Sequence, residues 1–188
     1  MKKAILIALT IVMALAPLAP SGAAAKVVRL GTDPAGDGPP ALDVTFLDVT
    51  RTGDDLEIRI GIDTMLPAIG GYPEGPGLEW IFKVGKRVFI AEAVAAYPTP
   101  KFFFFELKDG SFQQLESPTG TYASEDGFAR MLVPLTLIGA KTGTKIGGYR
   151  DPLAEIDKTN GTDVDSHIHT DGTQYLDDMK TTKSYVVP

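Results

Sequence analysis

The two histidines of the chain lie two residues apart in an acidic segment and are its clearest candidates for chemistry. On an extended strand, His167 and His169 would point to the same side, because successive side chains alternate between faces. Two imidazoles placed in this way can share a Zn or Cu ion, and Asp163, Asp165 and Asp171 could complete the site or orient the rings. A solvated acidic loop and a proton-sensing segment would have the same spacing. The pattern predicts a metal site and leaves both alternatives open.

A second set of acidic residues is suited to calcium. Asp33, Asp37 and Asp43 are spaced 4 and 6 residues apart in a segment rich in glycine and proline. Their carboxylates and nearby free carbonyls could converge on a hard cation, although the spacing is not that of an EF-hand. Ordinary turns, in which aspartate bonds to its own backbone, are the alternative.

Aromatic residues outside the apolar runs could stack on sugar rings, because planar rings suit the apolar faces of pyranoses. The candidate platform comprises Tyr72, Trp80, Tyr97, Tyr122 and Tyr149. Tyr72 and Tyr97 are the stronger candidates, since each is followed by proline in a predicted loop. Trp80, the only tryptophan, shares its predicted strand face with large apolar residues, which favours a place in the core.

Catalytic patterns are weak. Glu79 and Glu92 could face each other across a predicted hairpin as the carboxylate pair of a glycosidase, but cross-strand charged residues more often line a wet face. The chain contains no Gly-x-Ser-x-Gly, His-Glu-x-x-His, phosphate-loop or dinucleotide-binding motif. The sequence therefore favours a protein that binds over one that catalyses.

The elements that must position these residues are predicted to be strands. Apolar residues alternate with polar ones over 56–62, and a hairpin is expected over 78–94 with its turn at Gly85-Lys86. The four phenylalanines of 102–105 would load both faces of a strand. At Phe46-Leu47 the apolar phase shifts, which predicts a bulge or burial on both sides.

The later part of the chain is more polar. Residues 151–174 are predicted to form a long acidic surface loop, and residues 175–187 a closing strand or ordered tail. Strands recur roughly every 10 to 15 residues with turn signals between them, which is typical of sandwiches and barrels. We expect an all-β fold, a two-sheet antiparallel β-sandwich of jelly-roll or immunoglobulin-like topology, in one domain over residues 26–188.

The beginning of the chain is typical of an export signal. Lys2 and Lys3 precede an apolar stretch over 4–16, and small residues over 21–25 provide a peptidase site. An uncleaved anchor is the alternative, but the stretch is shorter than the ~20 residues that span a bilayer. We expect residues 1–25 to be removed and the protein to be secreted, periplasmic or at the cell surface, without membrane association afterwards.

Composition narrows the function classes. The 188 residues include no cysteine, which excludes disulfides, thiolate metal sites and thiol nucleophiles. The net charge of −6 argues against nucleic acid as a partner. An exported domain without disulfides must rely on packing, and a bound ion would add to its stability.

Several ordered features resemble a known group. They are 33–37 (Asp-Pro-Ala-Gly-Asp), 42–45 (Leu-Asp-Val-Thr), 52–58 (Thr-Gly-Asp-Asp-Leu-Glu-Ile), 133–135 (Val-Pro-Leu), 137–139 (Leu-Ile-Gly) and Gly143. Together they resemble the DOMON and family-9 carbohydrate-binding-module group of extracellular β-sandwiches. The resemblance implies a binding module for sugar, haem or calcium. No Met or His pair matches the haem ligands of that group.

These observations converge on a secreted, non-catalytic binding module for carbohydrate or a cell-envelope glycan, stabilised by calcium. Two alternatives stay open: a Zn- or Cu-binding protein centred on the His-x-His segment, and a surface or adhesion domain with a protein partner.

Overall fold

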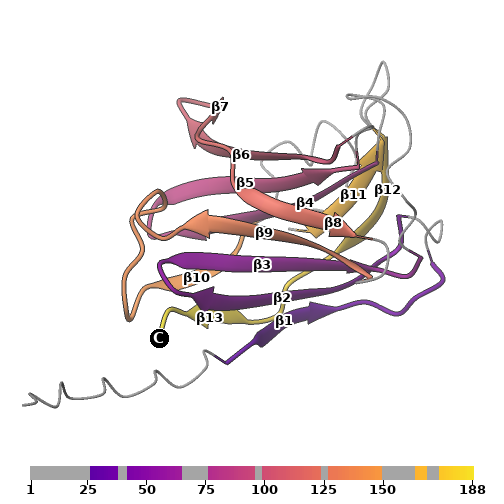
Figure 1. The fold of residues 1–188 in the computed structure, drawn as a ribbon, viewed down its shortest axis with the longest axis horizontal. Coiled ribbons are helices and arrows are strands. Elements are labelled where there is room, and N and C mark those ends of the chain that lie inside the picture. The colour runs from indigo at the N-terminus through magenta and orange to yellow at the C-terminus, as the bar shows by residue number, and fades with distance from the viewer. Residues whose placement is uncertain are drawn as a thin grey trace, which may run out of the picture.

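A computed structural model describes residues 26–37, 42–64, 76–95, 99–123, 127–149, 164–168 and 174–188. Within these ranges the chain forms strands in two antiparallel sheets, which Figure 1 shows as stacked layers. This confirms the predicted all-β, two-sheet fold. The predicted signal peptide lies outside the described residues. In the part of the chain that the structure describes, no helix has the length and apolar character needed to cross a membrane.

One sheet has five strands in the order β1-β2-β3-β9-β8. Their bounds are β1 Val28–Thr32, β2 Val44–Thr52, β3 Asp55–Ile62, β9 Phe128–Pro134 and β8 Thr119–Ala123. The faultless alternation over 56–62 forms β3 at the centre of this sheet, where it pairs with β2 and β9.

The second sheet has eight strands, six of which follow the order β12-β11-β4-β5-β6-β7. These are β12 Gln174–Met179, β11 Val164–Ile168, β4 Pro76–Val84, β5 Arg87–Val94, β6 Lys101–Lys108 and β7 Ser111–Gln114. Beside them, β10 Lys145–Gly148 pairs with both β4 and β13 Ser184–Val186. The predicted hairpin over 78–94 is confirmed as β4 and β5.

The facing sides of the sheets share one apolar core. Leu47 and Ile58 from the five-stranded sheet belong to the same buried cluster as Trp80, Phe82 and Phe104 from the other. Burial of this much apolar surface is the main favourable term in folding. The core therefore joins the two layers into one packed unit.

The phenylalanine run loads both faces of β6, as predicted. Phe104 is fully buried in the shared core. Phe105, one residue along, packs on the opposite side of the sheet against a second cluster that contains Ile81 and Ile90. The alternation of side chains along a strand accounts for this division.

The predicted phase shift in β2 is a register irregularity. The pairing of β2 with β3 shifts between Val44 and Phe46. Phe46 then lies over Gly61, where an added Cβ would come within 2.1 Å of the Phe46 ring. Glycine at position 61 therefore makes room for the ring on the solvent-facing side of the sheet.

The prediction of an uninterrupted loop over 151–174 is wrong. Residues 164–168 form β11, which pairs with β4 on one side and β12 on the other, and Val164 is fully buried. The reason is tertiary pairing: ladder hydrogen bonds and one buried valine override a polar local sequence. Downstream, the closing segment is two strands, β12 and β13, with different partners.

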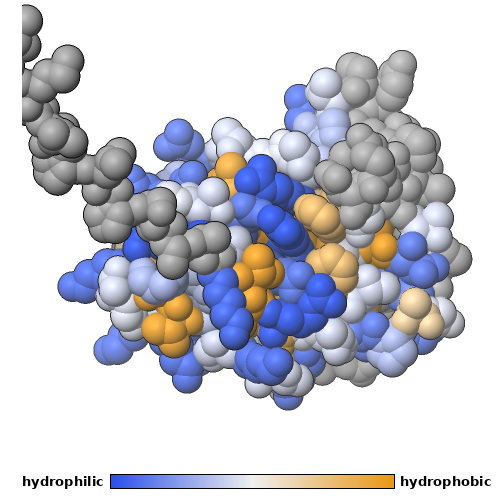
Figure 2. Space-filling model, turned by 60° about the horizontal axis from the view of Figure 1, so that its bottom comes forward, coloured by the Kyte–Doolittle hydropathy of each residue, from blue (hydrophilic) through white to orange (hydrophobic). Residues whose placement is uncertain are grey.

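The surface on the β1–β2 side is mostly hydrophilic. Figure 2 brings this side forward and shows hydrophilic residues separated by small hydrophobic patches. Scattered apolar side chains of this kind are normal for a protein surface.

Candidate functional site

Three chain segments meet around Asp43 at one end of the five-stranded sheet. The Asp63 amide, just after β3, donates a hydrogen bond to the Asp43 carbonyl oxygen at 2.9 Å. The Asp33 amide, just after β1, donates to the Thr45 carbonyl oxygen at 3.0 Å. These bonds place the connection that follows β1 beside the start of β2 and the end of β3.

The Asp43 carboxylate is buried there. Asp43 is 0% exposed, and its Oδ2 accepts a hydrogen bond from the Gly36 amide. Its other oxygen, Oδ1, has no hydrogen-bond partner among the residues that the structure describes. A buried charged oxygen without a partner is costly, so such atoms commonly contact a cation, a water molecule or a proton.

Gly36 brings the acidic segment onto this carboxylate. Its φ of 106° lies in the region that residues with a side chain rarely adopt. The turn directs the Gly36 amide at Asp43, so the segment that carries Asp33 and Asp37 folds back over the buried carboxylate.

The predicted calcium ligands are therefore brought together only in part. Asp43 is buried, Asp33 is half-buried and Asp37 is exposed. Among the described residues, no group of three or more carboxylates or histidines is arranged to hold a metal ion. Calcium takes about six to eight oxygen ligands, which can include backbone carbonyls and water. The described residues bring one buried oxygen without a partner to this place, so the calcium site stays a prediction.

Asp63 is a nearby residue that sequence reasoning missed. It follows the regular alternation of β3, and no local feature of the sequence links it to the segment after β1. Only the pairing of β2 with β3 places its backbone against Asp43. Its side chain is exposed.

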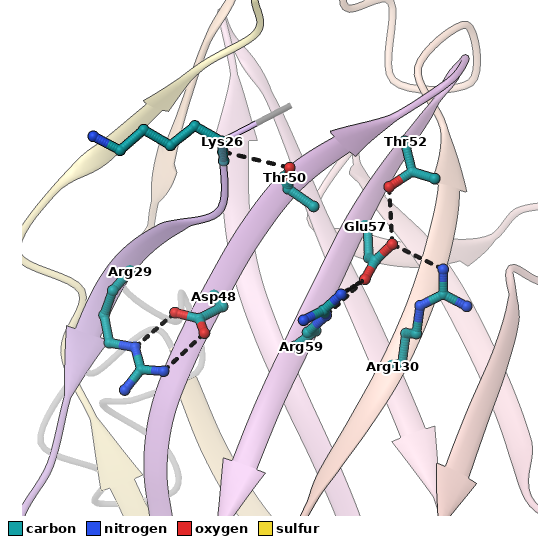
Figure 3. A network of polar contacts seen from close by, with 8 residues as sticks. All are labelled: Lys26, Arg29, Asp48, Thr50, Thr52, Glu57, Arg59 and Arg130. Atoms are coloured by element: carbon teal, nitrogen blue, oxygen red, sulfur yellow. Dashed lines mark hydrogen bonds and ion pairs between the residues drawn. The ribbon is translucent and has the colours of Figure 1, made fainter. Parts of the chain in front are cut away.

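A second polar cluster lies on the solvent-facing side of the five-stranded sheet (Figure 3). Glu57 accepts hydrogen bonds from Arg59 Nε at 2.6 Å, Arg130 Nη2 at 2.8 Å and Thr52 Oγ1 at 2.9 Å. The Arg130 hydrogen bond is the main cause that lowers the pKa of Glu57 to about 2, and the Thr52 and Arg59 hydrogen bonds add to it against the opposing effect of burial. The carboxylate is thus ionised and internally satisfied, which indicates a role in holding β2, β3 and β9 together.

Arg29 and Asp48 extend this polar surface to β1. Arg29 donates two hydrogen bonds to the Asp48 carboxylate, at 2.6 Å and 2.8 Å, in the bidentate geometry that arginine favours (Figure 3). The Arg29 guanidinium also lies 4.1 Å from the Phe46 ring centre. These groups are mutually satisfied, so the pair contributes to the sheet.

The structure places the residues of the predicted aromatic platform in different environments. Trp80 is fully buried and stacks on Phe82 with ring centres 4.4 Å apart, so its indole has no face available to a sugar. This is the core position that its strand pattern favours. Tyr72 and Tyr97 lie outside the described residues. Burial raises the pKa of Tyr122 to about 12, and Tyr149 is half-buried and packs against the apolar cluster of Ile81, Val88 and Ile90.

The predicted histidine site is described only in part. His167 lies in β11, in register with Gly77 of β4 and Tyr175 of β12. His169 and Asp171 lie outside the described residues, so their shared site stays a prediction.

Glu79 and Glu92 are directly paired across β4 and β5, as the hairpin predicts. Both residues are buried, at 8% and 6% exposed. Asp165 of β11 is in register with Glu79 on its other side. Asp178 of β12 is in register with Asp165 in turn, so four acidic residues occupy neighbouring positions of one row across the sheet. The glutamate pair is buried and does not line a wet face. That the glutamates are not catalytic stays a prediction.

Comparison with known proteins adds no identification. No family model, curated protein or solved structure matches the chain. The resemblance to the DOMON and family-9 group therefore stays a prediction.

Proposed function

We propose that the protein is an exported, non-catalytic binding module for carbohydrate or a cell-envelope glycan, with a calcium ion bound at Asp43. In this proposal residues 1–25 are removed, the product acts in the periplasm, at the cell surface or outside the cell, and the sandwich has jelly-roll or immunoglobulin-like topology. The single observation that carries the cation is the buried Asp43 Oδ1 without a partner among the described residues.

Calcium is the cation that the chemistry of this segment favours. All the candidate ligands are hard oxygen donors, which suit calcium better than zinc or copper. Calcium sites of extracellular modules commonly bind weakly, near the millimolar levels found outside cells. An exported domain without disulfides gains stability from any ion that binds only its native state.

Glycan binding is supported by the surface around Tyr149. This ring is half-buried, and Lys83 Nζ lies 5.7 Å from its centre, so an aromatic face and a cationic donor lie close together. Aromatic rings and a few placed polar groups are the usual components of sugar sites.

The test is a polysaccharide pull-down with the mature chain, repeated in CaCl2 and in EDTA. The proposal predicts retention on at least one insoluble or immobilised glycan, reduced by Tyr149→Ala and unchanged by Tyr185→Phe, a substitution within the core. Failure to bind any glycan of a broad panel in either buffer would contradict the binding function.

The Zn- or Cu-binding alternative keeps one specific observation in its favour. The register places Asp165 beside the buried Glu79, and His167 lies two residues further along the same strand. Carboxylates and imidazole together suit zinc. Zinc calorimetry on the native protein tests it: a heat lost in His167→Ala and kept in Ser166→Ala would support this function, and no heat would exclude it.

A further inference from the structure

A groove of about 410 Å3 lies where β10 joins β4 and β13. Its lining comes from three distant parts of the chain: the end of β4 and the following turn, β10, and the segment that leads into β13. Three of the lining residues are the exposed lysines Lys83, Lys145 and Lys183. The groove is thus assembled only in the folded protein.

A glycine forms the floor of this groove. Gly147 pairs with Lys83 on one side and with Ser184 on the other, so the three residues form one row across three strands. A Cβ at position 147 would come within 2.9 Å of Ser184 Oγ. Because Gly147 has no side chain, the space between Lys83 and Ser184 stays open.

The charge of the groove is opposite to that of the chain. The chain has a net charge of −6, yet no carboxylate occurs among the described residues that line this groove. Ser184 is also in the lining, whereas the hydroxyl of the neighbouring Thr182 donates to the Leu30 carbonyl oxygen at 3.3 Å. Ammonium groups with a hydroxyl donor beside them suit an oxyanion, which accepts several hydrogen bonds at once.

We infer that this groove binds an acidic group, a carboxylate or a phosphate, carried by a sugar polymer. The three lysines indicate an anionic ligand. Tyr149 indicates a sugar, because it comes directly after Gly148 of the lining and its ring centre is 5.7 Å from Lys83 Nζ. The sugar part of this inference rests on the proposed function, while the anion part stands on the groove alone. The groove is open, so it can accept one unit of a long chain.

The experiment is calorimetry of the full chain with three probes in low salt: polygalacturonate, which carries carboxylates, phosphomannan, which carries phosphates, and neutral dextran. We expect one or both acidic probes to bind, with affinity falling as salt rises. Lys83→Gln combined with Lys145→Gln should weaken binding on the order of 3- to 10-fold. The matched control is Lys26→Gln combined with Lys101→Gln, which removes the same charge from exposed lysines that do not line the groove.

The relative strength of the two acidic probes identifies the acidic group. Absence of binding to both acidic probes would overturn the inference, as would equal losses in the groove and control variants. Single-stranded DNA that binds as tightly as either polymer would contradict a sugar ligand. Dextran binding that the lysine substitutions do not change would support the proposed glycan-binding function, and it would contradict a role for this groove in that binding. Thermal melts of each variant establish that it is folded.

Discussion

Glu57 of β3 and Arg130 of β9 form an ion pair, with 2.8 Å between Glu57 Oε2 and Arg130 Nη2. The Glu57 side chain is only 3% exposed, although it lies on the outer side of the sheet, because Arg59, Arg130 and Thr52 surround it. A carboxylate removed from water and held by several donors stabilises a fold only while it is ionised. The stability of this sheet therefore depends on pH.

Acid should weaken the protein through Glu57. Its pKa is about 2 in the folded protein against 4.5 for the free group, so its contribution is complete above pH 4.5 and is lost as pH falls towards 2. Glu57→Gln should cost about 1–3 kcal/mol at pH 7 and less at pH 3. Urea denaturation at both pH values measures the difference.

The control for this prediction is Glu116→Gln, which removes an exposed carboxylate in the segment between β7 and β8. It should change the unfolding free energy by no more than about 0.5 kcal/mol at either pH. Equal losses at pH 7 and pH 3 for Glu57→Gln would show that its charge is not the source of its contribution.

Gly61→Ala should destabilise the five-stranded sheet. The added methyl group would lie 2.1 Å from the Phe46 ring, so the ring must move, at a cost of about 1–3 kcal/mol. In a Phe46→Ala background the same substitution should cost less than about 0.5 kcal/mol, because the clash is gone. The four chemical denaturation curves form a double-mutant cycle, and additive losses would contradict the contact.

Val164→Ala tests whether β11 belongs to the sandwich. Val164 is fully buried, so its truncation should cost about 1–3 kcal/mol of unfolding free energy. Val27→Ala, at a position 42% exposed, is the matched control and should have little effect. Similar small losses in both variants would mean that β11 does not contribute to the core.

The local pattern of apolar and polar residues was sufficient to predict most of the strands. Alternation predicted β3, the β4–β5 hairpin and the double loading of β6, because side-chain direction along a strand follows from the backbone alone. It could not predict β11, which pairs with β12 on one side and, on the other, with β4, over 80 residues earlier in the chain. Strand formation driven by a distant partner leaves no periodic signal in a short polar segment.

The candidate sites were less predictable. The acidic segment with Asp43 could be identified from its spacing, whereas the contact with Asp63 depends on the β2–β3 register. The lysine groove could not be predicted from the sequence, because Lys83, Lys145 and Lys183 lie far from one another along the chain. Only the pairing of β10 with β4 and β13 brings them to one groove. Trp80 illustrates the opposite case, in which the strand pattern correctly favoured the core.

Asp43→Asn separates a calcium site from a merely buried carboxylate. The substitution keeps the shape of the side chain and removes its charge, so it should abolish any response to calcium. In EDTA the variant should be as stable as the wild type or more stable, because a buried carboxylate oxygen without a partner among the described residues is replaced by a neutral amide. Asp54→Asn, whose carboxylate is fully exposed at the other end of the β2–β3 hairpin, is the control.

The most direct test of the proposed function is a thermal melt of the mature wild-type protein, first in EDTA and then with increasing CaCl2. Calcium at about ten times its dissociation constant would add about 1.4 kcal/mol, which corresponds to a rise of roughly 3–6 °C in Tm. We predict this rise for the wild type and for Asp54→Asn, and none for Asp43→Asn. A wild-type Tm that is the same in EDTA and in 10 mM CaCl2 (roughly ten times a millimolar dissociation constant) would contradict a calcium ion at Asp43.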